Sequence, residues 1–294
     1  MTSQGDPEPP PATPVSTVID LIGKVGSPLA IGSSLLYYFG WVRTVTQARL
    51  LGYDATLVGF SVEDYILKSV NVLFIPLIAL LLAFAGLVAV DQVLARKAKA
   101  SPAVGAILRV AGLMLRYAWV VLIPAGVAMT FFRVPGSFFA VPCAITVAMC
   151  GVLYASRIDR HLGEPPRSAL AGRIVVLTLL TLAVFWLTER LAQTMGQAFA
   201  ADLIHNPDQL TSVSVLSKQN LGIASSCVSE RRVGTGDGDF TFRYDGLRLL
   251  QAANDRQFLL SVCSGVPRVF VLSDGEGIRM EYAAASVGIR TGST

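Results

Sequence analysis

The feature that most constrains this chain is a long uncharged stretch in its first third. Residues 70–90 read VNVLFIPLIALLLAFAGLVAV, and Asn71 is the one polar side chain among them. About 20 consecutive apolar residues are needed to cross the hydrocarbon core of a bilayer. Ser61 and Asp64 before the stretch are typical of a helix start, and the basic segment RKAKA follows it. We therefore predict a membrane-spanning helix at 66–95.

The composition agrees with a membrane protein. The chain is 53% hydrophobic and 15% charged, whereas soluble domains are about 25% charged. The net charge of +4 is small and scattered, which excludes a nucleic-acid-binding surface and leaves the lipid bilayer as the predicted partner. The first residues, MTSQGDPEPPPATPV, are polar and proline-rich. We expect no cleavable signal peptide there, and a disordered cytoplasmic tail at 1–16.

Four further apolar stretches complete the predicted membrane part. They cover residues 28–45, 110–132, 137–155 and 174–195. The first is the shortest and ends in YYFGWVR, an aromatic run typical of a membrane–water boundary. Residues 46–60 fit either a surface loop or a re-entrant segment. The predicted fold class is an all-α membrane bundle of about five transmembrane helices at 17–200, followed by a small β-rich extracytoplasmic domain.

The pattern changes after the last predicted span. Short segments with alternating or β-branched residues follow one another, which is typical of strands. They are 212–217, 240–244, 247–253, 257–263, 268–273 and 278–283. The predicted turns between them are Asp245-Gly246, Asn254-Asp255 and Asp274-Gly275. We expect a β-rich domain at 201–288, folded as a small sandwich or half-barrel, and a frayed tail at 289–294.

The distribution of lysine and arginine predicts the orientation. With the N-terminus in the cytoplasm, the cytoplasmic loops hold eight basic residues: Arg96, Lys97, Lys99, Arg109, Arg157, Arg160, Arg167 and Arg173. The outer loops hold four: Arg43, Arg49, Lys68 and Arg133. Lysine and arginine accumulate in cytoplasmic loops. We therefore predict a multi-pass plasma-membrane protein with a cytoplasmic N-terminus and an extracytoplasmic C-terminal domain.

Four cysteines fall in two predicted environments. Cys227 and Cys263 lie in the β-rich domain, where an oxidising exterior favours a disulfide between them. Two buried thiols are the alternative. Cys143 and Cys150 share one face of the fourth span, where small packing residues are common between membrane helices.

Known catalytic and metal-binding patterns are missing from the sequence. The two histidines, His161 and His205, fall on opposite sides of the predicted membrane, so they cannot join one triad or one metal site. The run GTGDGD at 234–239 lacks the spacing of a phosphate loop and the ligand set of a calcium loop, and we interpret it as a flexible hairpin loop. We predict no catalytic residue, no metal site and no cofactor.

Polar residues inside the predicted spans are candidates for lining a hydrated pathway. They are Lys68, Asn71, Arg116, Thr130, Thr178 and Glu189. A charge in hydrocarbon is costly and normally faces a cavity or a partner, and Glu189 lies at a depth where it can pair with Lys68. The alternative is that these side chains reach the headgroups or cap helices, since most of them lie within two turns of a boundary.

One long run and the tail carry a resemblance. The run YYFGWVRTVTQARLLGYDATLVGFSVEDYILKSV, the four spans that follow, and a tail containing FRYDGLRLL and QFLLS resemble uncharacterised multi-pass membrane proteins of actinobacteria. The resemblance covers most of the chain after residue 28. It implies a Gram-positive plasma membrane and an extracytoplasmic C-terminal domain, and it brings no activity and no site residue.

These observations favour a non-enzymatic membrane protein. We expect the β-rich domain to recognise or assemble with an extracytoplasmic ligand or protein, while the bundle serves as anchor or relay. The alternative is a homo-oligomeric ion channel whose second span lines the pathway. A membrane-embedded enzyme is the least favoured function, because the acids it needs would have to gather in one cavity.

Overall fold

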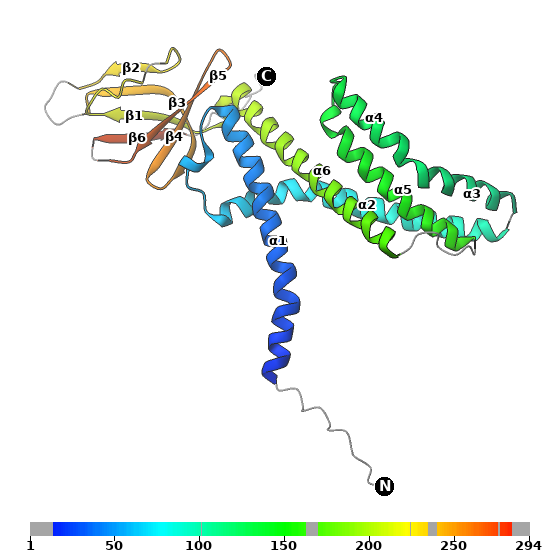
Figure 1. Ribbon diagram of the computed structural model, residues 1–294. Coiled ribbons are helices and arrows are strands. Elements are labelled where there is room, and N and C mark those ends of the chain that lie inside the picture. Colours follow the sequence, from blue (N-terminus) through cyan, green and yellow to red (C-terminus); the bar gives the residue numbers. More distant parts are fainter. Residues whose placement is uncertain are drawn as a thin grey trace, which may run out of the picture.

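In the computed structural model a helical part is followed by an antiparallel sheet (Figure 1). The structure describes residues 14–100, 102–162, 170–223, 225–234, 240–275 and 277–283. Its helices are α1 (Pro14–Leu51), α2 (Val62–Ala100), α3 (Pro102–Tyr117), α4 (Trp119–Phe131), α5 (Ala140–His161) and α6 (Leu170–His205). The short 3₁₀ helices are η1 (Ala55–Leu57), η2 (Ser137–Phe139) and η3 (Pro207–Gln209). Of the tail predicted at 1–16, residues 1–13 lie outside the described residues, whereas residues 14–16 belong to α1 and are helical. The tail predicted at 289–294 and residues 235–239 of the GTGDGD loop also lie outside the described residues.

By length and composition, fewer of the described helices qualify as membrane crossings than the five that the sequence predicts. Three helical stretches, Val62–Gln92, Ser137–Arg160 and Leu170–His205, are long and apolar enough to cross a membrane. The pair Gly105–Tyr117 and Trp119–Phe131, bent by 44°, makes a fourth crossing if it counts as one span. The predicted first span at 28–45 is not among them. Five spans are therefore not confirmed in the part of the chain that the structure describes.

Two glycines allow α1 to pack closely against α2 and α6. A Cβ added to Gly40 would lie 1.9 Å from the backbone oxygen of Tyr65 in α2. A Cβ on Gly196 of α6 would lie 2.5 Å from the backbone oxygen of Arg43. Small residues let membrane helices touch backbone to backbone. The three helices share a buried apolar cluster formed by Phe39, Val42, Val72 and Ala192.

The third predicted span is a broken helix that packs along α5. We expect Pro124 and Gly126 to interrupt this span, but the break lies earlier, at Ala118 between α3 and α4. Gly126 instead packs against α5, where an added Cβ would lie 3.0 Å from a backbone oxygen. Gly151 of α5 makes the same kind of approach to Leu115 of α3. The two halves of the span therefore both use α5 as their support.

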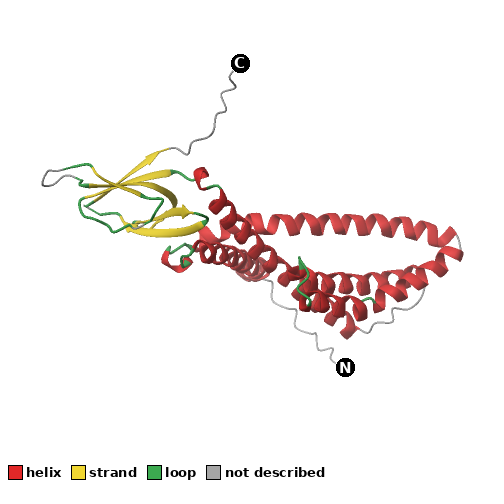
Figure 2. Ribbon diagram, turned by 90° about the horizontal axis from the view of Figure 1, so that it is seen from above, coloured by secondary structure: helices red, strands yellow, loops and turns green. Residues whose placement is uncertain are grey.

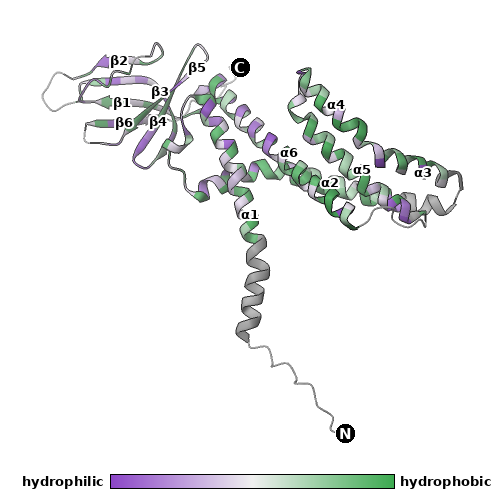
Figure 3. Ribbon diagram, viewed as in Figure 1, coloured by the Kyte–Doolittle hydropathy of each residue, from purple (hydrophilic) through white to green (hydrophobic). Residues whose placement is uncertain are grey.

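Helix α2 stands apart from the rest of the bundle along its middle (Figure 2). Leu80 and Leu82 there are 60% and 68% exposed. The helix is held near its two ends instead, by Gly40 at one end and by an ion pair of Asp91 with Arg157 of α5 at the other, 3.5 Å long. Figure 3 shows the helices as mainly hydrophobic, while hydrophilic residues are frequent in the sheet. The unpaired apolar surface of α2 suits lipid.

The C-terminal strands form one antiparallel sheet and not the predicted sandwich or half-barrel. The strands are β1 (Ser212–Ser217), β2 (Ser229–Arg232), β3 (Phe242–Ala253), β4 (Arg256–Cys263), β5 (Val266–Ser273) and β6 (Ile278–Ala283). Their order is β5-β4-β3-β1-β6, and β2 pairs with β3. The predicted segments at 240–244 and 247–253 are joined in the single strand β3, and β2 was not predicted.

The turns explain why two predicted segments become one strand. Asn254 and Asp255 have φ angles of +50° and +55° and form the predicted two-residue turn between β3 and β4. Gly246 has φ +98°, yet β3 continues through it. An added Cβ at Gly246 would lie 2.3 Å from the backbone oxygen of Cys227. The glycine therefore allows a close approach within the sheet and does not end a strand.

One face of the sheet carries a buried apolar core. Its fully buried members are Val213, Val215, Tyr244, Leu247 and Leu259, and Ile223 from the segment before β2 joins them. The Tyr244 hydroxyl accepts a hydrogen bond from Leu221 N at 2.9 Å and donates to Asn220 Oδ1 at 3.1 Å. The segment that covers this face is thereby fixed to the sheet. The opposite face is available for other contacts.

Candidate functional site

The opposite face of the sheet carries a charged network. Cross-strand neighbours point to the same face, and Ser214 of β1 pairs with Glu281 of β6. The network, which we call the charged face, consists of Ser214, Arg243, Asp245, Arg279 and Glu281, together with Arg231 across from Arg243. Residues from four strands therefore meet on the face of the sheet opposite the apolar core, which the segment between β1 and β2 does not cover.

Hydrogen bonds order the centre of the charged face. Arg243 Nε donates to Asp245 Oδ1 at 3.0 Å, and its Nη1 lies 3.5 Å from Glu281 Oε2. Ser214 Oγ donates to Asp245 Oδ1 at 2.6 Å. The Arg243 side chain stays 35% exposed. The result is an ordered ionic surface whose guanidinium and carboxylate groups are partly exposed.

The electrostatics of Asp245 follow from these contacts. Burial acts to raise the pKa of Asp245, but hydrogen bonds from Ser214 and Arg243 and the charges of Arg243 and Arg231 outweigh it. The pKa of Asp245 is therefore below its ordinary value, and the carboxylate is ionised at neutral pH.

The same face of the sheet docks on the ends of two helices. Leu260 of β4 is buried in one cluster with Leu51 of α1 and with Ala200 and Leu203 of α6. Around it pack Tyr53, Ile204, Leu210, Leu250, Val262 and Val269. We call this cluster the docking patch. Strand β3 contributes Leu250 to the docking patch and Arg243 to the charged face, so one strand connects the two.

The segment after α1 closes the docking patch. Tyr53 packs on Phe258 of β4, with ring centroids 6.0 Å apart, and burial raises the pKa of Tyr53 to about 12. The Asn254 side chain donates to the backbone oxygen of Val58 at 3.2 Å. Residues 46–60, which fit a loop or a re-entrant segment by sequence, thus end α1 and then pack against the sheet.

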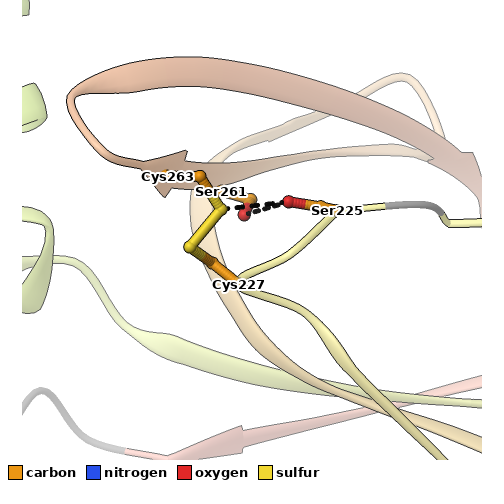
Figure 4. The surroundings of a disulfide bond; sticks show 4 residues. All are labelled: Ser225, Cys227, Ser261 and Cys263. Atoms are coloured by element: carbon orange, nitrogen blue, oxygen red, sulfur yellow. Dashed lines mark hydrogen bonds between the residues drawn. A yellow bond between two sulfur atoms is a disulfide. The ribbon is translucent and has the colours of Figure 1, made fainter.

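Cys227 and Cys263, the predicted pair, are joined by a disulfide with Cα atoms 5.7 Å apart (Figure 4). Ser225 Oγ lies 3.3 Å from Ser261 Oγ and 3.2 Å from Cys263 Sγ. A cavity of about 530 Å³ lies beside them, with serine hydroxyls and Arg268 in its wall. The bridge ties the segment before β2 to β4. Cys143 and Cys150 are free and exposed on α5.

The six polar residues proposed for a pathway lie in separate places. Lys68 Nζ sits 3.3 Å from the centroid of the Phe60 ring, and Glu189 accepts a hydrogen bond from Gln193 at 3.1 Å. Thr130 and Thr178 bond backward to their own helices, and Asn71 is exposed. Within the described residues no hydrogen bond or ion pair joins any two of the six, and none joins Lys68 to Glu189.

Arg116 has a partner that the sequence analysis missed. Its Nη2 donates to Asp159 Oδ2 of α5, and the two side chains are 22% and 11% exposed. Asp159 falls in the predicted basic loop, but α5 continues to His161. A longer helix brings this acid against α3. The charged face was missed as well, although Arg243 and Asp245 share the strand period of two that places both on one face.

The described part of the chain contains no group of three or more His, Cys, Asp or Glu side chains arranged to hold a metal ion. Comparisons with protein-family models, curated proteins and solved structures gave no match. The interpretation of this protein therefore rests on its own geometry.

Proposed function

We propose that this chain is a non-enzymatic integral membrane protein whose sheet recognises a partner outside the plasma membrane. The charged face makes the contact, and the docking patch connects it to α1 and α6. The observation that carries the proposal is the sharing of β3 between the two surfaces. An ionic surface suits a partner with complementary charges, since such surfaces give specificity and fast association.

The distribution of basic residues supports the outer position of the sheet. Contacts of Asn254 with Val58, and of Arg190 with Phe138 at 4.0 Å, put the α1–α2 and α4–α5 connections at the sheet end of the bundle. The end of α2, the start of α3, the end of α5 and the start of α6 lie at the other end and hold most of the basic residues of the helical part. By the positive-inside tendency that end is cytoplasmic. This support does not depend on whether α1 crosses the membrane.

The direction of α1 supports a cytoplasmic N-terminus. Phe39 packs on Phe185 and Leu51 on Leu203, so α1 and α6 run in the same direction toward the sheet. The 38 residues of α1 extend over about 57 Å at 1.5 Å per residue. This length exceeds the roughly 30 Å of a hydrocarbon core.

The test uses a cysteine on the charged face. Arg279→Cys, at a side chain that is 63% exposed, is labelled in intact cells with a membrane-impermeant photo-crosslinker. We expect labelling, and a covalent adduct with a partner that disappears when Arg243→Ala is added. Arg256→Cys, on the exposed hairpin end of β4, is the matched control and should give no such adduct.

The two parts of the proposal fail separately. If Arg279→Cys is labelled only after the cells are permeabilised, the sheet does not lie outside the membrane. Labelling without an adduct specific to Arg279→Cys, or an adduct that survives Arg243→Ala, contradicts recognition by the charged face.

A further inference from the structure

The helical part contains a cavity of about 750 Å³ between α3, α4, α5 and α6. Its wall is mainly apolar, with Leu113, Ile123, Val176 and Leu179 among the lining residues. Binding sites for small molecules have this size and character, with a few polar groups that fix the orientation. The cavity lies at the far side of the bundle from the sheet and has no part in the recognition proposed above.

The break between α3 and α4 lies at the cavity. Tyr117 and Trp119, on either side of Ala118, line it and are 57% and 46% exposed. The cavity therefore opens to the outer surface of the helices. In a membrane this surface is in contact with lipid. Broken helices at membrane depth are tolerated where they line a cavity or are buried in protein.

The polar end of the cavity is formed by Arg116 and Ser156. Arg116 uses Nη2 to bind Asp159, and this is its one partner among the residues described. A guanidinium group has five N–H donors. The other N–H groups of Arg116, which lines the cavity, therefore make no hydrogen bond to a described residue, and the nearby Asp159 balances its charge. Ser156 turns its hydroxyl to Val152 O at 3.3 Å and adds no free donor.

A ligand for this cavity must combine two properties. An apolar body is needed against the aliphatic wall, since polar atoms there would lose their hydrogen bonds. An acceptor is needed at Arg116, because unsatisfied donors in an apolar site are costly and guanidinium groups bind phosphate oxygens well. The bilayer offers one abundant molecule with both properties.

We propose that the cavity binds one bilayer phospholipid. Its phosphodiester oxygens accept hydrogen bonds from Arg116, and one acyl chain lies against Leu113, Ile123 and Leu179. The remaining chain leaves through the opening beside Tyr117 and Trp119. The site is a structural lipid site inside the bundle and is separate from general contact with the bilayer.

Native mass spectrometry of the delipidated full-length protein tests this proposal. The probes are phosphatidylglycerol and a diacylglycerol with the same acyl chains. Gly172 lines the cavity, and a Cβ there meets no atom within 4 Å. Gly172→Leu should fill the cavity and weaken phosphatidylglycerol binding by about tenfold or more. Gly86→Leu is the matched control, since a Cβ on Gly86 of α2 also meets no atom within 4 Å and Gly86 does not line the cavity.

A second variant tests the role of the guanidinium group. Arg116→Lys keeps the charge beside Asp159 and removes the planar set of donors. It should reduce the preference for phosphatidylglycerol over diacylglycerol by about tenfold. Equal binding by Gly172→Leu and Gly86→Leu overturns the site. Equal binding of the two probes by the parent protein overturns the phosphate contact and assigns the cavity to an apolar occupant.

Discussion

The sheet and the helical part bury their side chains in opposite ways. In the sheet, Tyr244, Leu247 and Leu259 are fully buried behind a covering segment. In the helical part, large apolar side chains such as Leu80 and Leu82 are mostly exposed, and the closest contacts are made by Gly40 and Gly196. The helices do share the buried cluster of Phe39, Val42, Val72 and Ala192, but most of their large apolar side chains lie outside it.

The difference is explained by the solvent of each part. Water drives apolar side chains into the core of the sheet. In lipid this driving force between helices is absent, and close backbone packing through small residues takes its place. Substitutions at the contact glycines Gly40 and Gly196 should therefore disturb the packing of the helices, and truncations of large buried side chains should affect the sheet most.

The largest expected effect is that of Gly40→Leu. The Cβ of the added side chain would lie 1.9 Å from the backbone oxygen of Tyr65 in α2. The loss of folding free energy should therefore exceed the about 1–3 kcal/mol of ordinary overpacking. Hydrogen exchange in nanodiscs should show loss of protection in the second half of α1 and the start of α2, while β1 and the core of β3 stay protected. Gly86→Leu should change neither part. Intact protection of α1 and α2 in Gly40→Leu would contradict backbone packing as the main contact.

A pair of neighbouring leucines sharpens the comparison where the two parts meet. Leu260 lies in the docking patch and Leu259 in the core on the other face of β4. Each change to alanine should cost about 2–5 kcal/mol. Leu260→Ala should also reduce hydrogen-exchange protection at the ends of α1 and α6, whereas Leu259→Ala should leave those helix ends unchanged. The same change in helix protection in both variants would show that the docking patch does not specifically stabilise the ends of α1 and α6.

The smallest expected effect concerns pH and the charged face. The pKa of Asp245 is lower in the folded than in the unfolded protein, so its contribution is present above the ordinary aspartate pKa and disappears as the pH falls through the folded value. Because Asp245 is partly exposed, the contribution should stay below about 1 kcal/mol. Asp245→Asn should melt earlier than the parent at pH 6, and the two melting curves should converge below pH 3. Asp274→Asn serves as control, and a difference that grows on acidification would contradict this sign.

The strands were largely predictable from the sequence because their alternation is local. All six predicted segments fall in or overlap strands, and Asn254-Asp255 forms a turn as expected. Strand β2 was missed because SERR carries no apolar alternation and is exposed throughout. Gly246 was misread because its neighbour in space, Cys227, is distant in sequence.

The helical part was predictable in kind and less so in detail. The apolar stretches identify helices, but the position of the break at Ala118 and the pairing of Arg116 with Asp159 depend on which helix lies alongside. The site was harder still. The charged face is built from β1, β2, β3 and β6, and the docking patch joins Leu51 to Leu260, so neither surface exists within one segment.

The docking patch also sets an order for biogenesis. Leu51 is made early and needs Leu203 and Leu260 to cover it. At about 5–20 residues per second of synthesis, the segment around Leu260 follows Leu51 by roughly 10–40 s. During that interval the end of α1 lacks the apolar partners that cover Leu51 in the folded protein. The first helix and the last strands of this protein are therefore linked in time during synthesis as well as in space.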